Sequence, residues 1–341
     1  MMNIQSKLHN TTVEVEGFKS WQIILIFLAF LITFIIFTVI KKIYYSIRYQ
    51  KRFYIIPRPS IKGISNIGMV ISISVAVIIL LTVLSANTAS VIFRAWPGTR
   101  VTLEGILIKI GGLLFGPILG IFIGAMTDLL AVALTAGVFH HGYLIAAMAY
   151  GLIGGLIRII LTTSKKRDIP FAIYSSLATL FIGVIIVLFL YFAPGIKDNG
   201  FSIQVFGFDL RLPATTMIAL ISGFFVVSII VVWLCLLVKW LIKKYSKKQQ
   251  KGNWFVVFTP VLVTILLTEA VVNLLMMPSF DAELSSLKYT QWLSIRAALF
   301  PFMVILNLMI IYPIFKIVVP LIRYEYEDDI VEDKNVPIHV D

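Results

Sequence analysis

The chain has 341 residues, of which 59% are apolar and 13% are charged, and its mean hydropathy is +0.97. This composition excludes an ordinary soluble domain, because several stretches exceed the roughly 20 apolar residues that cross a bilayer. The single cysteine, Cys235, lies within an apolar run, which excludes a disulfide framework and a thiolate metal site. The sequence therefore predicts an all-α, polytopic helical membrane protein.

The net charge of +12 is gathered in short segments between apolar stretches. Basic residues cluster in 41–62, 165–167 and 243–251, and the alternate loops lack such clusters. This is the positive-inside pattern of a membrane protein, so nucleic acid is not expected as a partner. We predict a multi-pass protein of the plasma membrane with its N-terminus outside and its C-terminus in the cytoplasm.

Nine apolar segments are expected to be membrane helices. In chain order they are 21–40, 66–93, 103–115, 117–136, 143–161, 171–192, 214–242, 254–277 and 292–321. The first is too long for the core of a signal peptide and is followed directly by Lys41 and Lys42, so we interpret it as a retained span. The third is short for a span. Loops 94–102, 137–141 and 278–291 are expected outside, and the acidic tail is expected to be mobile.

A Gly-Pro corner joins the third and fourth segments. Pro117 falls in the first turn of a helix, where its missing N–H costs nothing. Gly116, Gly120, Gly124 and Asp128 follow at four-residue spacing and therefore share one helix face. A second ridge of small residues, formed by Ala147, Gly151 and Gly155, is a natural packing partner for the first. The Asp128 carboxylate should face protein or a water-filled cavity, because a charge in lipid is costly.

Most intramembrane polar groups are predicted to lie in the outer half of the membrane. They are Glu104, Asp128, Glu269, Asn273 and Arg296, with His140 and His141 capping an outer turn, while Lys109 is predicted near mid-depth. For each residue alone, a snorkelling or internally paired role stays open. Their clustering on several separate helices favours a polar pocket that opens outward and captures a ligand.

No pattern in the chain predicts an enzyme. The glycines of 111–116 are not a nucleotide-binding loop, since no Gly-x-x-x-x-Gly-Lys-Ser/Thr sequence is present. No nucleophile–base pair follows from the spacing. The adjacent His140 and His141 lack a third ligand nearby in the sequence, so a metal site is not expected. We therefore expect no cofactor and no ATP-hydrolysing machinery in the chain itself.

Residues 66–162 resemble the substrate-binding S component of energy-coupling-factor (ECF) vitamin transporters. The matching sequences are Arg100-Val-Thr, Gly112-Leu-Leu-Phe-Gly-Pro-Ile-Leu-Gly, Gly124-Ala-Met-Thr-Asp128-Leu-Leu, Phe139-His-His-Gly142-Tyr and the glycines 151, 154 and 155. Near the end of the chain, Asn273 and Gln291-Trp292-Leu293-Ser294-Ile295-Arg296 are most similar to the folate-type branch.

The resemblance implies a six-helix core that binds a vitamin beneath its outer loops. It also implies partners: a membrane scaffold subunit and two cytoplasmic ATPase subunits that hydrolyse ATP. The first core helix would contact the scaffold through small residues, here approximated by Ser72 and Ala76. S components are usually about half this length, so roughly three spans are additions.

Five parts follow from this comparison. Residues 1–65 form an additional span and a basic cytoplasmic linker, 66–162 form core helices one to four, 163–253 form an inserted helix pair, 254–322 form core helices five and six, and 323–341 form the acidic cytoplasmic tail. An interface with the scaffold or with lipid is the simplest role for the added spans.

Folate is the preferred ligand, with riboflavin or another flat vitamin as the alternative. Arg94, Arg100 or Arg296 could bind a ligand carboxylate, Asp128 or Glu104 could accept from pterin N–H groups, and Trp96, Tyr143 or Trp292 could stack on a flat ring. A second class of function also stays open. An autonomous secondary carrier could use Glu104, Lys109, Asp128 and Glu269 for ion coupling.

Overall fold

The computed structural model describes residues 20–48, 51–53, 61–84, 99–135, 139–163, 168–192, 201–205, 208–245, 254–285, 287–321 and 331–333. Its helices are α1 (Ser20–Arg48), α2 (Ile61–Leu84), α4 (Thr99–Phe115), α5 (Pro117–Thr135), α6 (His141–Thr163), α7 (Asp168–Phe192), α9 (Ala214–Tyr245), α10 (Trp254–Thr268), the π-helix η1 (Glu269–Met276), α11 (Met277–Leu284) and α12 (Tyr289–Leu321). The strands are β1 (Lys51–Phe53), β2 (Phe201–Val205), β3 (Phe208–Leu212) and β4 (Val331–Asp333). The prediction of a polytopic helical membrane protein is confirmed.

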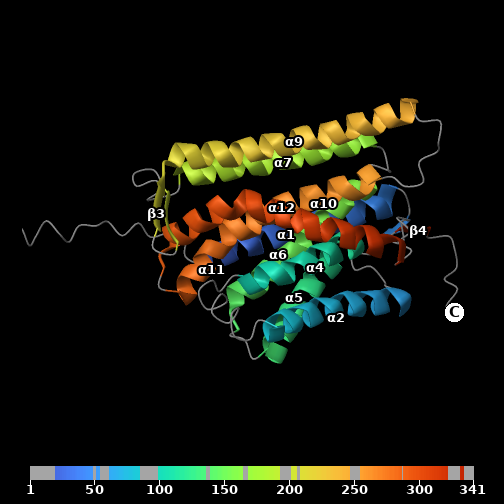
Figure 1. Cartoon of the computed structure of the whole chain (residues 1–341). Coiled ribbons are helices and arrows are strands. Elements are labelled where there is room, and N and C mark those ends of the chain that lie inside the picture. The colour runs from blue at the N-terminus through green and yellow to red at the C-terminus, as the bar shows by residue number, and fades with distance from the viewer. Residues whose placement is uncertain are drawn as a thin grey trace, which may run out of the picture.

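Eight helical segments of the described chain are long and apolar enough to cross a membrane. They agree with the predicted spans except for the third, Gly105–Phe115, which is apolar but shorter. Figure 1 shows the long helices side by side, with α11 and the β2–β3 hairpin at one end and β4 at the other. Helices suit lipid because every backbone N–H and C=O between the helix ends is satisfied within the helix.

Glycines bring α4, α5 and α6 into direct backbone contact. A Cβ atom added to Gly151 of α6 would lie 1.9 Å from the carbonyl oxygen of Gly120 on α5, and one added to Gly124 would lie 2.3 Å from that of Ala147. Gly155 meets Pro117 in the same way. The two predicted ridges of small residues therefore pack against each other, as the sequence indicated.

The Gly-Pro corner between α4 and α5 is closed by a glycine and an arginine. Gly116 has φ = 90°, a conformation that side chains with a Cβ rarely adopt, and so it ends α4 directly before Pro117. The guanidinium of Arg158 on α6 donates a hydrogen bond of 2.6 Å to the carbonyl oxygen of Leu114. The last turn of α4 thus has a partner for a backbone acceptor that the helix leaves free.

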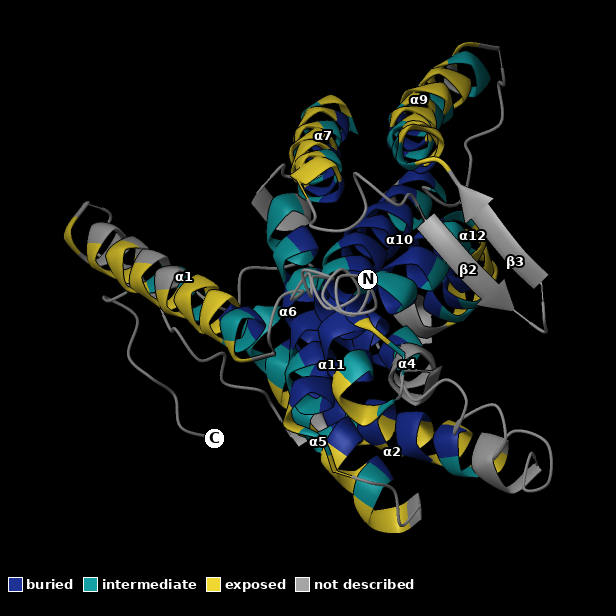
Figure 2. Cartoon of the chain, turned by 90° about the vertical axis from the view of Figure 1, so that its left-hand side faces the viewer, coloured by how far each residue is buried: buried dark blue, intermediate teal, exposed yellow. Residues whose placement is uncertain are grey.

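The most buried segment is the continuous run α10–η1–α11. Figure 2 shows buried residues concentrated on α6, α10 and α11, whereas α1, α7 and α9 carry many exposed residues. The main apolar core joins α4, α10 and α12 to the inner faces of α7 and α9, which contribute Ile186, Leu190, Met217, Ile221 and Phe225. The predicted inserted pair therefore packs on this core with one face and presents its other, apolar face outward.

Three connections differ from the predicted loops. The expected loop 278–291 is largely helical, because α11 continues to Leu284 and α12 begins at Tyr289; the buried Met277–Asp281 stretch carries this extension into the core. The connection between α7 and α9 contains the antiparallel hairpin β2–β3. In the acidic tail, Val331–Asp333 pairs with β1 of the basic linker, so this part of the tail is ordered. Acidic and basic residues occupy opposite positions in that register, which favours the pairing.

The glycine packing predicts a large difference between two substitutions of the same kind. We expect Gly151→Ala to lower stability by about 1–3 kcal/mol, because the new methyl group overlaps the backbone of α5. Gly68→Ala on α2 is the matched control: its methyl group would have no neighbour within 4 Å, so stability should change by about 1 kcal/mol or less. Thermal unfolding of the purified variants measures both. Equal melting temperatures for the two variants would contradict the packing.

Candidate functional site

Four buried charged side chains of the membrane helices form two ion pairs. Lys109 of α4 pairs with Glu269 of η1, with 2.6 Å between Nζ and Oε1. Arg296 of α12 pairs with Asp281 of α11, donating from Nε to Oδ2 over 2.8 Å. All four side chains are at most 2% exposed, so neither pair is shielded by bulk water.

The Lys109 ammonium has three neighbours. Besides Glu269, it donates a 3.3 Å hydrogen bond to Oδ1 of Asn307 on α12, and it lies 4.7 Å from the ring centroid of Tyr150 on α6. An ammonium over an aromatic face is stabilised by the ring's negative face, and more so when water is excluded. Side chains from α6, η1 and α12 thus contact the ammonium group that α4 supplies.

The Arg296–Asp281 pair is completed by a tyrosine. Tyr143 of α6 donates its hydroxyl to Oδ1 of Asp281 over 2.8 Å, while the Arg296 guanidinium occupies Oδ2. Both carboxylate oxygens therefore accept hydrogen bonds, as a buried carboxylate requires. This arrangement joins α6, α11 and α12.

Asn273 links the two ion pairs. Its Nδ2 donates to Oε2 of Glu269 over 2.6 Å, and its Oδ1 accepts a hydrogen bond from the Arg296 guanidinium. A continuous chain of contacts therefore runs from Asn307 to Tyr143, in the order Asn307, Lys109, Glu269, Asn273, Arg296, Asp281 and Tyr143. We call these seven residues the polar network.

The formal charges of the polar network sum to zero, since it holds one lysine, one arginine, one aspartate and one glutamate. Moving a charge out of water costs several kcal/mol, and only a close partner with further hydrogen bonds offsets this. The network supplies both. In this structure the charged groups of the network bind one another.

Glu269 and Asn273 lie on the π-helix η1. Such helices are rare and occur frequently at functional sites, because the wider turn re-aims side chains. Thr268, just before η1, donates its hydroxyl to the carbonyl oxygens of Thr264 and Ile265. These bonds satisfy carbonyls where the α-helical pattern changes.

A second cluster lies where α6 begins. His140 Nε2 is 3.1 Å from Oε2 of Glu283 on α11, and its ring stacks on that of His141 with 4.5 Å between centroids. Burial lowers the pKa of His140 below its usual value, against the smaller opposing effect of its hydrogen bond to Glu283. Burial therefore favours the neutral form of the His140 ring.

Asp128 is buried on the small-residue face of α5, as predicted. The contacts of Gly120 with Gly151 and of Gly124 with Ala147 set the register of α5 on α6. One further turn places Asp128 level with Tyr143. The carboxylate therefore lies on the protein-facing side of α5, beside the helix that reaches the polar network.

Four of the predicted site residues are not located by the structure. Arg94 and Trp96 lie outside the described residues, and Arg100 and Glu104 lie on α4 at positions whose side chains are not described. Trp292 is buried and donates its indole N–H to Ser285 Oγ over 2.6 Å, so its ring packs inside the protein. The structure brings together Lys109, Tyr143, Glu269, Asn273 and Arg296.

Sequence reasoning missed Asp281, Glu283, Tyr150 and Asn307. Asp281 and Glu283 fall in a stretch expected to be a loop, so their burial and placement depend on the helical extension to Leu284. Asn307 carried a usable signal, because an amide in the middle of an apolar span indicates an internal partner.

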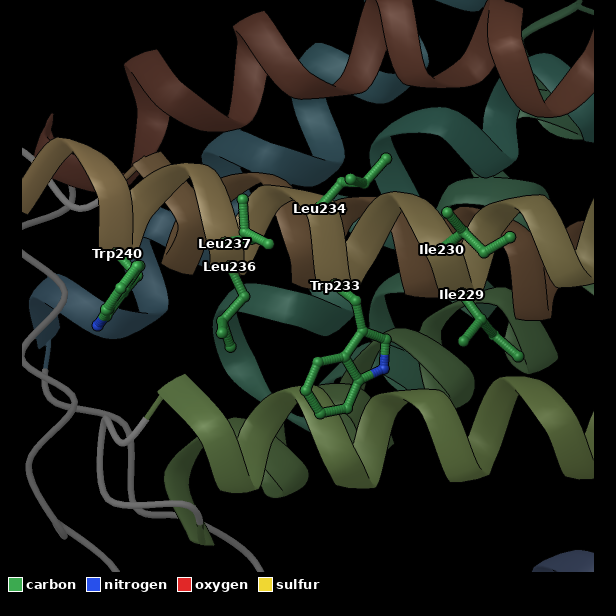
Figure 3. Close-up of a pocket in the computed structure, with 7 residues that line it drawn as sticks. All are labelled: Ile229, Ile230, Trp233, Leu234, Leu236, Leu237 and Trp240. Carbon is green, nitrogen blue, oxygen red and sulfur yellow. The ribbon is translucent and has the colours of Figure 1, made fainter.

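An apolar groove of about 560 Å³ lies away from the polar network. Its lining residues all come from α9: Ile229, Ile230, Trp233, Leu234, Leu236, Leu237 and Trp240 (Figure 3). A groove with this lining offers no polar group to a vitamin and suits lipid chains.

Comparisons with known proteins identify one relationship. The "Uncharacterized protein MG098 homolog" of Mycoplasma pneumoniae is 30% identical over 326 residues, which span 84% of this chain and 67% of that protein. The chain belongs to the family of that protein. No protein-family model and no solved structure matches the chain. Because the MG098 homolog is itself uncharacterized, the relationship assigns no substrate.

Removing only one partner of a buried ion pair should destabilise the protein more, per substitution, than removing both partners together. We expect Lys109→Met or Glu269→Gln alone to lower stability by about 3–5 kcal/mol, because each leaves an uncompensated buried charge. The double variant should lose much less than the sum of the two. Thermal unfolding of the three variants gives this coupling energy.

The matched control is the pair of Lys239 on α9 and Asp168 on α7, which is partly exposed. Removing one partner there should cost about 1 kcal/mol or less. Additive losses for Lys109 and Glu269, or equal losses at the two pairs, would show that the polar network does not hold these charges.

Proposed function

We propose that the chain is the substrate-binding subunit of an ECF-type importer and that it binds a vitamin, preferentially folate, from outside the cell. One observation carries the proposal. The residues of the S-component-like motif, Gly112, Gly120, Gly124, Gly151 and Gly155, form the backbone-to-backbone contacts at the centre of α4, α5 and α6. These residues of the motif thus form a packed structural unit, which supports the proposal.

The remaining helices suit the same arrangement. Helices α2, α4, α5 and α6, the run α10–η1–α11, and α12 correspond to six core helices, with α1, α7 and α9 as additions. On α2, the apolar side chains of Ile67, Val70, Ile71 and Val75 pack inward, while Ser72 and Ala76 are exposed. An exposed face of small residues on a membrane helix allows close approach of a partner helix, here the scaffold subunit.

The polar network supplies the chemistry for a ligand with carboxylates. Arg296 already binds a carboxylate in this structure, that of Asp281. A carboxylate of a folate glutamate tail can take the same place on the guanidinium, which leaves the Asp281 carboxylate without its charged partner. Asp281 would then keep its hydrogen bond from Tyr143 and accept further hydrogen bonds from N–H groups of the ligand.

Two substitutions on α2 separate ligand capture from assembly. In Ser72→Leu/Ala76→Leu we expect vitamin affinity of the purified chain to stay within about twofold, while co-purification with the scaffold and ATPase subunits is lost, because bulky side chains keep the helices apart. Gly223→Leu on α9 is the control: this glycine is also exposed, with no neighbour within 4 Å of an added Cβ. It should leave both binding and assembly intact.

A panel of vitamins tested for binding to the purified chain identifies the ligand. Folate binding that is lost in Arg296→Gln supports the proposal, whereas flavin retained through purification without folate binding replaces folate by riboflavin. If the purified chain binds no vitamin, and if it transports a substrate without the scaffold and ATPase subunits, the S-subunit assignment is contradicted.

A second function is favoured by the buried ion pairs, one of which includes Glu269 of the π-helix η1. Ionisable groups at the interface of interrupted membrane helices are typical ion-coupling sites of secondary carriers. Reconstitution of this chain alone in liposomes distinguishes the two. Uptake driven by an ion gradient, with no ATPase present, would establish the carrier and exclude the S subunit.

A further inference from the structure

Three metal-ligating side chains gather at the start of α6, apart from the polar network. His141 is the first residue of α6, His140 directly precedes it, and Glu283 comes from α11. One ligand atom of each lies within 4.8 Å of the others. The sequence hid this cluster, because Glu283 is separated from His140 by 143 residues.

The His140 ring is held firmly in place. Its side chain is only 10% exposed, and it packs against Tyr143 and Phe280, with ring centroids 5.2 Å and 6.0 Å away. Its backbone carbonyl accepts hydrogen bonds from the N–H groups of Tyr143 and Leu144. The imidazole is thus oriented before any ligand arrives, which lowers the entropy cost of binding.

One nitrogen of this ring lacks a partner. Nδ1 of His140 is buried and has no hydrogen bond to any residue that the structure describes. Nε2, which lies 3.1 Å from Glu283 Oε2, is therefore the ring nitrogen that an ion shared with Glu283 would use.

We propose that His140, His141 and Glu283 bind a divalent transition-metal ion of the Zn²⁺ class. Two imidazoles and one carboxylate form a ligand set that suits Zn²⁺, Ni²⁺ or Co²⁺ and disfavours Mg²⁺ and Ca²⁺, which prefer oxygen ligands only. This site goes beyond the transport function proposed above and does not depend on it.

The spacing agrees with such an ion. Ligands at about 2.1 Å from a tetrahedral Zn²⁺ lie roughly 3.4 Å from one another, close to the 3.1 Å between His140 Nε2 and Glu283 Oε2. His141 and Glu283 are exposed and can rotate to complete the shell. Three protein ligands leave one tetrahedral position for water.

A metal ion here would cross-link α6 and α11. Glu283 lies two residues after Asp281, which holds Arg296 and Tyr143. The ion would therefore fix the end of α11 over the polar network, and its loss would free that end to move.

Metal titration of the full-length chain tests the proposal. The detergent-purified protein is stripped with chelator and then titrated with ZnCl₂ or CoCl₂. We expect one equivalent to bind with micromolar or tighter affinity, the Co²⁺ complex to show the visible bands of a tetrahedral site, and the melting temperature to rise with Zn²⁺. His141→Ala and Glu283→Gln, both at exposed positions that the fold tolerates, should each weaken binding by at least about tenfold.

The two histidines outside the described residues, His9 and His339, provide the matched control. His9→Ala/His339→Ala should bind the metal as tightly as the parent chain. Binding that is lost in this control but kept in His141→Ala and Glu283→Gln would overturn the site. So would the absence of saturable binding in a parent chain whose melting curve shows that it is folded.

Discussion

The structure depends on the pairing of charges that lie inside the membrane-spanning part. Water cannot solvate Lys109, Glu269, Asp281 or Arg296 there, so each must have an opposite charge within hydrogen-bond distance. Asn273 then makes the two pairs one unit. Because the members come from α4, α6, η1, α11 and α12, satisfying these charges fixes five elements relative to one another. Apolar packing alone determines the relative positions of helices in lipid much less closely, because lipid is as apolar as the side chains.

Glycine packing makes this pairing geometrically possible. Gly154 of α6 lies against the backbone carbonyl of Lys109, and Gly105 lies against the ring of Tyr150. A larger side chain at either position would move α4 away from α6 and take Lys109 from the face of Tyr150. The glycine ridges and the polar network are therefore two parts of one constraint. The glycines let the helix backbones approach closely, and this approach allows the short contacts between the charged side chains.

Features with a strong local signal could be predicted from the sequence, and features that arise from tertiary contacts could not. Apolar length predicted the spans, and four-residue spacing predicted the contact of the Gly120 face with Gly151. The cost of polar groups inside a membrane predicted that such residues cluster, but not which of them pair. The π-helix, the burial of Asp281 and the approach of Glu283 to His140 depend on how a polar-looking stretch packs, and no local pattern in 278–285 indicates a helix.

The central claim is that the two buried carboxylates are ionised and bound to Lys109 and Arg296. Infrared spectroscopy measures this directly, because protonated and ionised carboxyl groups absorb in separate regions. At neutral pH the account predicts that the Glu269→Gln and Asp281→Asn variants lose ionised-carboxylate absorbance and no protonated-carboxyl absorbance relative to the parent chain. Loss of a protonated-carboxyl band in either variant would show that the charges are not paired as described.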